Sequence, residues 1–79
     1  IDEHRVGSIK DELREVLIGY EPRLIRQSIS VQRDESIDRS ELTIRFLVRA
    51  DLDCEPVNVP LQFVADVELD TGKIAIKNR

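Results

Sequence analysis

The sequence predicts an α+β fold in which one N-terminal amphipathic helix packs on a small, mainly antiparallel, four-stranded sheet. Two observations predict this fold. Apolar residues recur with a period of about 3.6 up to Tyr20 and with a period of two after Arg23. Between these segments, Pro22 disfavours the helical conformation at Glu21 and has no backbone N–H to donate. The change from helix to sheet is therefore expected at Glu21 to Arg23.

The helix is expected to begin after Ser8, a suitable N-cap, and to end near Gly19 or Tyr20. Asp11 follows Ser8 at the capping-box position that Glu or Gln normally takes. Apolar side chains form one stripe along this segment, so one face of the helix is expected to be buried. The stripe consists of Ile9, Leu13, Val16, Leu17 and Tyr20.

The first two strands are expected at residues 25–32 and 42–52, joined by a polar loop over residues 33–41. In both strands alternate positions are apolar, as in a strand with one buried face. The second strand has the more regular pattern. The positions expected to face the core are Ile25, Gln27, Ile29 and Val31 in the first strand and Leu42, Ile44, Phe46, Val48 and Ala50 in the second.

The third and fourth strands are expected at residues 61–69 and 73–77. Residues 53–60 contain two prolines and are expected to form a loop before the third strand. A turn then leads into the fourth strand, and in it Gly72 is expected to take a positive φ.

The outer face of this sheet, away from the helix, is expected to carry cross-strand ion pairs. It also carries two apolar residues, Leu47 and Val64. Because one helix covers only one face of a sheet, these residues indicate a further cover, either upstream helices or a partner protein. If the second and third strands pair antiparallel, the ion pairs join Arg45 and Arg49 to Asp66 and Glu68.

Catalytic, metal and cofactor sites are not expected. The 79 residues include one cysteine, Cys54, and one histidine, His4, so neither an internal disulfide nor a His/Cys metal cluster can form. No Ser, Thr or Cys has an obvious base beside it, and no glycine-rich loop is present to hold a phosphate. The 16 acidic residues could supply the carboxylate pair of a glycosidase, but little is present to bind a sugar. A binding module without a small-molecule substrate is expected.

The charge and hydropathy of the chain limit its partners and location. The net charge of -4 is spread over both halves, so no basic face for nucleic acid is expected. The apolar runs are too short for membrane insertion, and the free thiol fits a cytoplasmic protein. Residues 1–79 are expected to form a single domain. Because the chain starts at Ile1 without a methionine, upstream residues are expected to be missing.

The segment Glu21-Pro22-Arg23 has two interpretations. It can be a helix stop followed by a solvated charge. Alternatively, it can be a docking knob, because Glu21 places a negative charge at the helix C-terminus, where the helix dipole disfavours it and a cation is needed. Arg23, Arg26 or a partner could supply this cation. Pro22 stiffens the corner, so little conformational freedom is lost on binding.

These residues resemble a known family. The features that carry the resemblance are the amphipathic helix running into Tyr20-Glu21-Pro22-Arg23-Leu24, the strand Leu42-Thr43-Ile44-Arg45-Phe46 and the closing Asp70-Thr71-Gly72. Together they are similar to the TssE family of type VI secretion baseplate wedge subunits and to the small baseplate wedge proteins of contractile phage tails, whose hallmark is a Glu-Pro-Arg motif. The similarity covers nearly the whole chain.

The resemblance implies a structural role in a baseplate, from which a contractile sheath polymerises. It implies that Glu21, Pro22 and Arg23 dock onto the wedge proteins TssF and TssG. It also implies that the sheet accepts strands from the sheath, which TssB and TssC form. The first strand is poorly protected against edge pairing, so we expect it to lie at the accepting edge, with the fourth strand as the competing candidate. The expected partner-binding residues are Glu21, Pro22, Arg23, Arg26, Ile29 and Val31.

Two other functions compete with this one. The anti-adapter IraD shares the expected fold and binds a response regulator, so a regulatory interaction protein is the alternative. A peptidoglycan hydrolase is the third possibility, because related proteins were once labelled lysozyme-related. The Glu-Pro-Arg segment favours the baseplate hypothesis.

Overall fold

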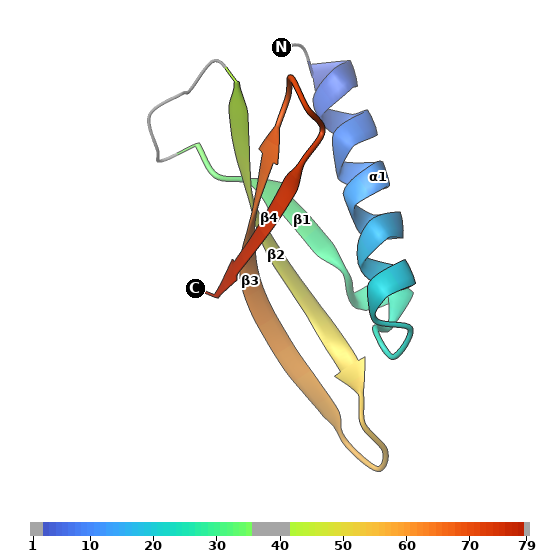
Figure 1. Ribbon diagram of the computed structural model, residues 1–79. Helices are drawn as coiled ribbons and strands as arrows, with labels where there is room; N and C mark the ends of the chain where they lie inside the picture. The colour runs from blue at the N-terminus through green and yellow to red at the C-terminus, as the bar shows by residue number, and fades with distance from the viewer. Residues whose placement is uncertain (1–2, 36–41, 79) are drawn as a thin grey trace.

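The computed structural model describes residues 3–35 and 42–78, and these residues form one helix beside a four-stranded antiparallel sheet (Figure 1). The strands follow one another in the sheet in the order β1-β2-β3-β4, so β1 and β4 are its edges. The predicted α+β class is confirmed. The elements are α1 (Glu3–Tyr20), the 3-10 helix η1 (Arg26–Ser28), β1 (Ser30–Arg33), β2 (Thr43–Asp53), β3 (Asn58–Glu68) and β4 (Ile74–Asn78).

Helix α1 begins earlier than the sequence predicts. Ser8 is not an N-cap, because it lies inside the helix and its hydroxyl donates a hydrogen bond to the carbonyl of His4, 3.3 Å away. The reason is tertiary: Val6 is buried, so the apolar stripe extends one turn upstream, and this packing outweighs the local capping preference of Ser8. The buried residues of α1 are Val6, Leu13 and Leu17.

The first strand is shorter than predicted, because residues 26–28 form η1 instead. The hydroxyl of Ser28 accepts the N–H of Asp51 at 2.8 Å and donates to the carbonyl of Ile25 at 2.6 Å. One side chain thus takes the place that a backbone carbonyl would fill in a regular ladder, and the chain can curl without leaving the N–H of Asp51 unpaired.

Strand β3 begins at Asn58, so residues 58–60 do not belong to the predicted loop. The N–H of Glu68 donates to the carbonyl of Lys73, on the β4 side of β3. Because backbone groups alternate along a strand, Pro60 also directs its nitrogen to this side. The pairing with β4 extends only to Phe63, so the missing N–H of Pro60 faces an open edge and costs no ladder bond.

The core lies between α1 and the sheet, as predicted. Phe46 and Val48 in the centre of β2 are fully buried. Four residues of the predicted inner faces are exposed. Leu42 precedes β2, Gln27 lies in η1, and Val16 and Tyr20 on α1 are 39% and 86% exposed. The remaining core residues are Val6, Leu13, Leu17, Leu24, Ile29, Val31, Ile44, Ala50, Ala65 and Val67.

The turn before β4 and the pairing of β2 with β3 match the prediction. Gly72 has a φ of 74°, a conformation that other residues rarely adopt. On the outer face, Leu47 lies opposite Val64, and both are half-buried. The ion pair between Arg45 and Asp66 is present, with Nε and Oδ1 2.7 Å apart.

The expected ion pairing of Arg49 with a carboxylate of β3 is wrong. Arg49 lies opposite Gln62, and Glu68 lies opposite Thr43. Along β2, Arg49 is four residues from the position opposite Asp66 and six from the position opposite Glu68. These spacings correspond to about 13 and 20 Å, which are beyond ion-pair reach. Lys77 approaches Asp66 instead, with Nζ 3.2 Å from Oδ2.

Candidate docking site

The Glu21-Pro22-Arg23 segment forms a tight corner between α1 and the sheet. The N–H of Glu21 donates to the carbonyl of Leu17 at 2.9 Å and makes the last helical hydrogen bond. The N–H of Leu24 then donates to the carbonyl of Glu21 at 3.1 Å, closing a turn with Pro22 and Arg23 at its centre. Proline suits the second position of such a turn because its ring fixes φ.

Glu21 and Arg23 form a closed ion pair at the tip of this corner. The Nε of Arg23 lies 2.8 Å from Oε1 of Glu21, and Nη2 lies 3.3 Å from Oε2. The same Oε1 accepts the backbone N–H of Arg23 at 3.1 Å. The hydrogen bonds from Arg23 hold the pKa of Glu21 below its ordinary value, and those to Glu21 raise the pKa of Arg23. Arg23 therefore supplies the cation that Glu21 needs at the helix C-terminus.

Arg26 does not join this pair. Its Nη1 lies 2.5 Å from Oε2 of Glu15, on α1, and its hydrogen bonds to Glu15 lower the pKa of that carboxyl. The contact ties η1 to α1 across the outside of the molecule. Both side chains are largely exposed, so we expect the contribution of the pair to folding stability to be small.

The corner is attached to the end of β2 by backbone hydrogen bonds. The N–H of Asp53 donates to the carbonyl of Arg23, and the N–H of Ile25 donates to that of Asp51, each at 2.9 Å. Between these bonds, Leu24 lies opposite Leu52 and is buried. The backbone beneath the ion pair is thus part of the sheet, and the two exposed charges are held in a defined place.

Ile29 and Val31 lie apart from the corner and differ from it in character. Both side chains are buried against α1, and the N–H of Ile29 donates to the carbonyl of Arg26 at 3.3 Å. The side chains of Ile29 and Val31 are therefore not accessible to a partner. The N–H of Asp34 donates to Arg45 on β2, so by alternation Val31 and Arg33 direct their backbone groups away from the sheet.

Strand β4 is the second open edge. Ala75 and Lys77 lie on the side of β4 that bonds to β3, by the alternation that begins at the Lys73 carbonyl, so Ile74 and Ile76 direct their backbone groups outward. The two edges named by the sequence are thus both edges of the sheet.

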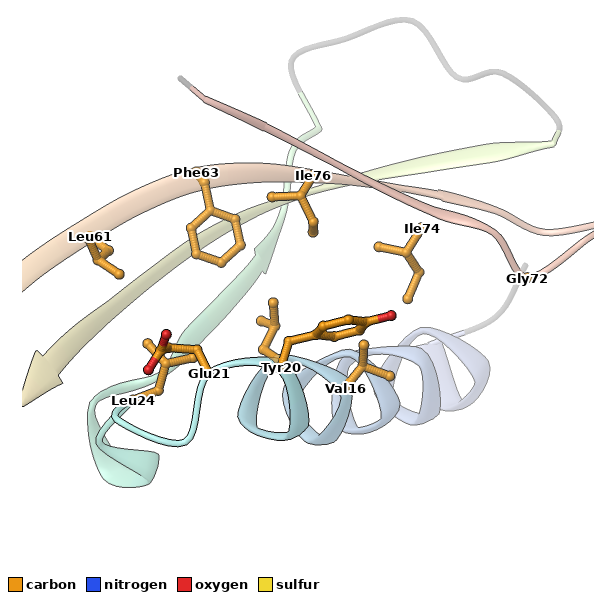
Figure 2. A pocket seen from close by; sticks show the side chains of 10 residues that line it. Val16, Tyr20, Glu21, Leu24, Leu61, Phe63, Gly72, Ile74 and Ile76 are labelled. Carbon is orange, nitrogen blue, oxygen red and sulfur yellow. The ribbon is translucent and has the colours of Figure 1, made fainter.

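An apolar groove runs between α1 and the β3–β4 hairpin, and the sequence did not predict it. Its volume is about 520 Å³. Figure 2 shows Tyr20 and Val16 on α1 facing Ile74 and Ile76 across it, with Glu21 near the end where Leu61 and Leu24 lie. One feature of the sequence could have indicated the groove: the apolar stripe on α1 is broader than the surface that one pair of strands can cover. The lining residues are Val16, Leu17, Tyr20, Glu21, Leu24, Leu61, Phe63, Gly72, Ile74 and Ile76.

The described residues contain no group of three or more His, Cys, Asp or Glu side chains placed to hold a metal ion. Cys54 is a half-buried free thiol in the short connection between β2 and β3. Within residues 3–35 and 42–78, no helix is both long enough and apolar enough to cross a membrane.

The sequence model of the protein family described as "Baseplate wedge protein gp25" matches residues 1–57 of this 79-residue chain. The matched part includes α1, the Glu21-Pro22-Arg23 corner, β1 and β2. No curated protein and no solved structure matches the chain.

Proposed function

The chain belongs to the baseplate wedge protein gp25 family, and we propose that within it this protein is the TssE-like wedge subunit of a type VI secretion system. The family is a structural one, made up of components of phage-tail-like baseplates and not of enzymes. The proposed location is the cytoplasm, and the proposed task is to join the baseplate wedge to the contractile sheath.

The observation that carries this proposal is the preformed corner. Arg23 and Glu21 are exposed, but their backbone is bonded to β2, so binding a partner requires little new ordering. An ion pair on a rigid turn is a specific recognition element, because a partner must offer both an acceptor for Arg23 and a donor for Glu21. We assign this corner to docking on the wedge proteins TssF and TssG.

The sheet edges support the second half of the proposal. Unpaired backbone groups on a short edge strand are a template for an added strand. We assign β1 as the edge that accepts a strand of the sheath proteins TssB and TssC. In this role Ile29 and Val31 act by holding β1 against α1, because their side chains are buried. Strand β4 is the alternative edge.

The test is co-purification of the tagged protein from cells, with bound proteins identified by mass spectrometry. Wild type is compared with Arg23→Ala and with Arg14→Ala, a matched control whose guanidinium also pairs with a nearby carboxylate on α1, that of Asp11. We expect wild type and the control to recover TssF, TssG and the sheath proteins. Arg23→Ala should lose the wedge proteins while remaining folded by circular dichroism.

Two results would overturn the proposal. Recovery of a response regulator in place of wedge proteins would indicate an anti-adapter. Full retention of TssF and TssG by folded Arg23→Ala would show that the corner is only a helix stop.

A further inference from the structure

The side of the sheet that faces α1 is covered over only part of its width. On β2, four of the five inward residues are buried, and Leu52 at the end of the strand is half-buried. On β3, Ala65 and Val67 are buried but Leu61 and Phe63 are only half-buried, and on β4 Ile76 is 51% exposed. Burial therefore declines from β2 to β4 along one face. The uncovered part is the floor of the apolar groove (Figure 2).

We propose that this groove receives an amphipathic helix with basic flanks from a baseplate wedge protein. This inference rests on the proposed function, which it deepens by naming the chemistry of the docking element. It combines three features of the groove: its width, the shape of its α1 wall and the charge on its rim.

The first feature is width. Four strands spaced about 4.8 Å apart span about 19 Å, whereas a helix with its side chains is about 10 Å across. One helix therefore covers about half of this sheet, and the uncovered half has room for one more. The groove is also continuous with the docking corner, since Glu21 and Leu24 line both.

The second feature is the α1 wall. Ser8, Glu12, Val16 and Tyr20 follow one another at four-residue intervals and line either the groove or the smaller hollow that continues it along α1. Residues four apart form a ridge on a helix surface, and such ridges fit the grooves of a second helix. The wall thus has the form that helix-on-helix packing requires.

The third feature is charge. The groove and its continuation are lined by three carboxylates, Glu12, Glu21 and Glu68, and by one guanidinium, that of Arg5. Glu21 is already paired with Arg23, so the acidic character of the rim comes from Glu12 and Glu68. The whole chain carries a net charge of -4. A helix with Leu-like residues on one face and Lys or Arg along its flanks complements both the apolar floor and this rim.

A second copy of the chain is a poorer occupant. Helix α1 of a second copy carries acidic and basic residues in nearly equal number, so it offers no continuous basic flank to the rim. The acidic ones are Glu3, Asp11, Glu12 and Glu15, and the basic ones are Arg5, Lys10 and Arg14. A strand added to β4 would extend the sheet sideways and leave the α1 wall uncovered.

The experiment uses two synthetic helical peptides with the same leucine face, one with Lys and one with Glu on the flanks. Each is titrated into the isotope-labelled 79-residue protein, and amide shifts are followed by NMR. The Lys peptide should perturb residues of α1 and the β3–β4 hairpin, and added salt should weaken it. The affinity of the Glu peptide should be lower by about tenfold or more.

Two variants and two matched controls locate the site. Val16→Glu and Glu12→Lys alter the α1 wall, whereas Val57→Glu and Glu55→Lys make the same changes on the exposed connection after β2. Both wall variants should weaken the Lys peptide about tenfold, in keeping with loss of an anchor or of rim charge, and the controls should not.

Equal affinity for the two peptides, shifts confined to β4, or a dimer that Val16→Glu dissociates would overturn the inference. The same variants in the co-purification separate it from the proposed function. If Val16→Glu retains TssF and TssG and the Lys peptide does not bind, the groove inference fails and the proposed function stands. If the Lys peptide binds in the groove but wild type recovers no wedge protein, the proposed function fails.

Discussion

The Nε of Arg23 lies 2.8 Å from Oε1 of Glu21, and the same carboxylate oxygen accepts the backbone N–H of Arg23. The side chain and the backbone of Arg23 thus both donate to Oε1 of Glu21, across Pro22. This contact answers the electrostatic problem of a carboxylate at a helix C-terminus, and it does so within the corner itself.

Arg23→Ala should reduce docking on the wedge far more than it reduces stability. The guanidinium is largely exposed, so its removal should hardly change Tm. Binding to purified TssF and TssG should fall about tenfold or more, as for a charged hot spot. Calorimetric melting and a binding titration on the same samples check this. A large loss of Tm with normal docking by the folded fraction would make the pair a fold element.

Asp66→Asn should change the pH dependence of stability. The hydrogen bonds from Arg45 and then Lys77 hold the pKa of Asp66 below its ordinary value of 3.8. Folding therefore favours the ionised form, whose stabilisation is present above pH 3.8 and is lost as pH falls through the lower folded value. At neutral pH the variant should melt roughly 5 °C lower than wild type.

Thermal melts of both proteins from neutral to acid pH provide the check. The two Tm values should converge below pH 3.8. A difference that stays constant down to acid pH would show that the contact is insensitive to the charge of Asp66.

Ser28→Ala should destabilise the fold by about 1 to 3 kcal/mol, because it removes two hydrogen bonds and leaves the partly buried N–H of Asp51 without its acceptor. Chemical denaturation measures the free energy of unfolding. Ser30→Ala, at an exposed position of β1, is the matched control and should have little effect. Equal effects of the two changes would contradict the role given to the Ser28 hydroxyl.

Proline at the sheet edges should identify the strand that accepts the sheath. Arg33 and Asn78 end the two edge strands, and both direct their backbone N–H outward. Arg33→Pro should abolish recovery of TssB and TssC while keeping the wedge proteins, and Asn78→Pro should retain both. The reverse pattern would assign the sheath to β4. Ile29 is unsuitable for this test, because its N–H is already bonded to Arg26.

Pro60→Val should promote self-association. The substitution restores an N–H on the open side of β3, at a position beyond the reach of β4, and adds a residue with high β-propensity. Light scattering at increasing concentration should show larger particles than for wild type, with little change in secondary structure. Unaltered scattering would show that Pro60 does not protect this edge.

Local pattern was enough for much of the fold. The helix, the four strands that follow it along the chain, the central alternation of β2 and the positive φ of Gly72 all follow from periodicity and turn chemistry, which act over a few neighbouring residues. The order of the strands in the sheet came from the structure. The Glu21-Pro22-Arg23 corner was also recognisable, because proline placement and the charge at a helix end are local properties.

Contacts between distant segments decided the remainder. Ser8 lies inside α1 because Val6 is buried by the sheet, and residues 26–28 curl because Ser28 bonds to Asp51, 23 positions away. The choice of Arg23 over Arg26 as the partner of Glu21 depended on the position of Glu15.

The sequence by itself determined the succession of one helix and four strands and the place of the Glu21-Pro22-Arg23 corner, since these follow from short-range sterics and periodicity. Only the tertiary structure decided which apolar residues are covered. Val16 and Tyr20 belong to the same stripe as Leu13 and Leu17, yet α1 is too narrow to cover the whole sheet, so the stripe is buried on one side and open on the other.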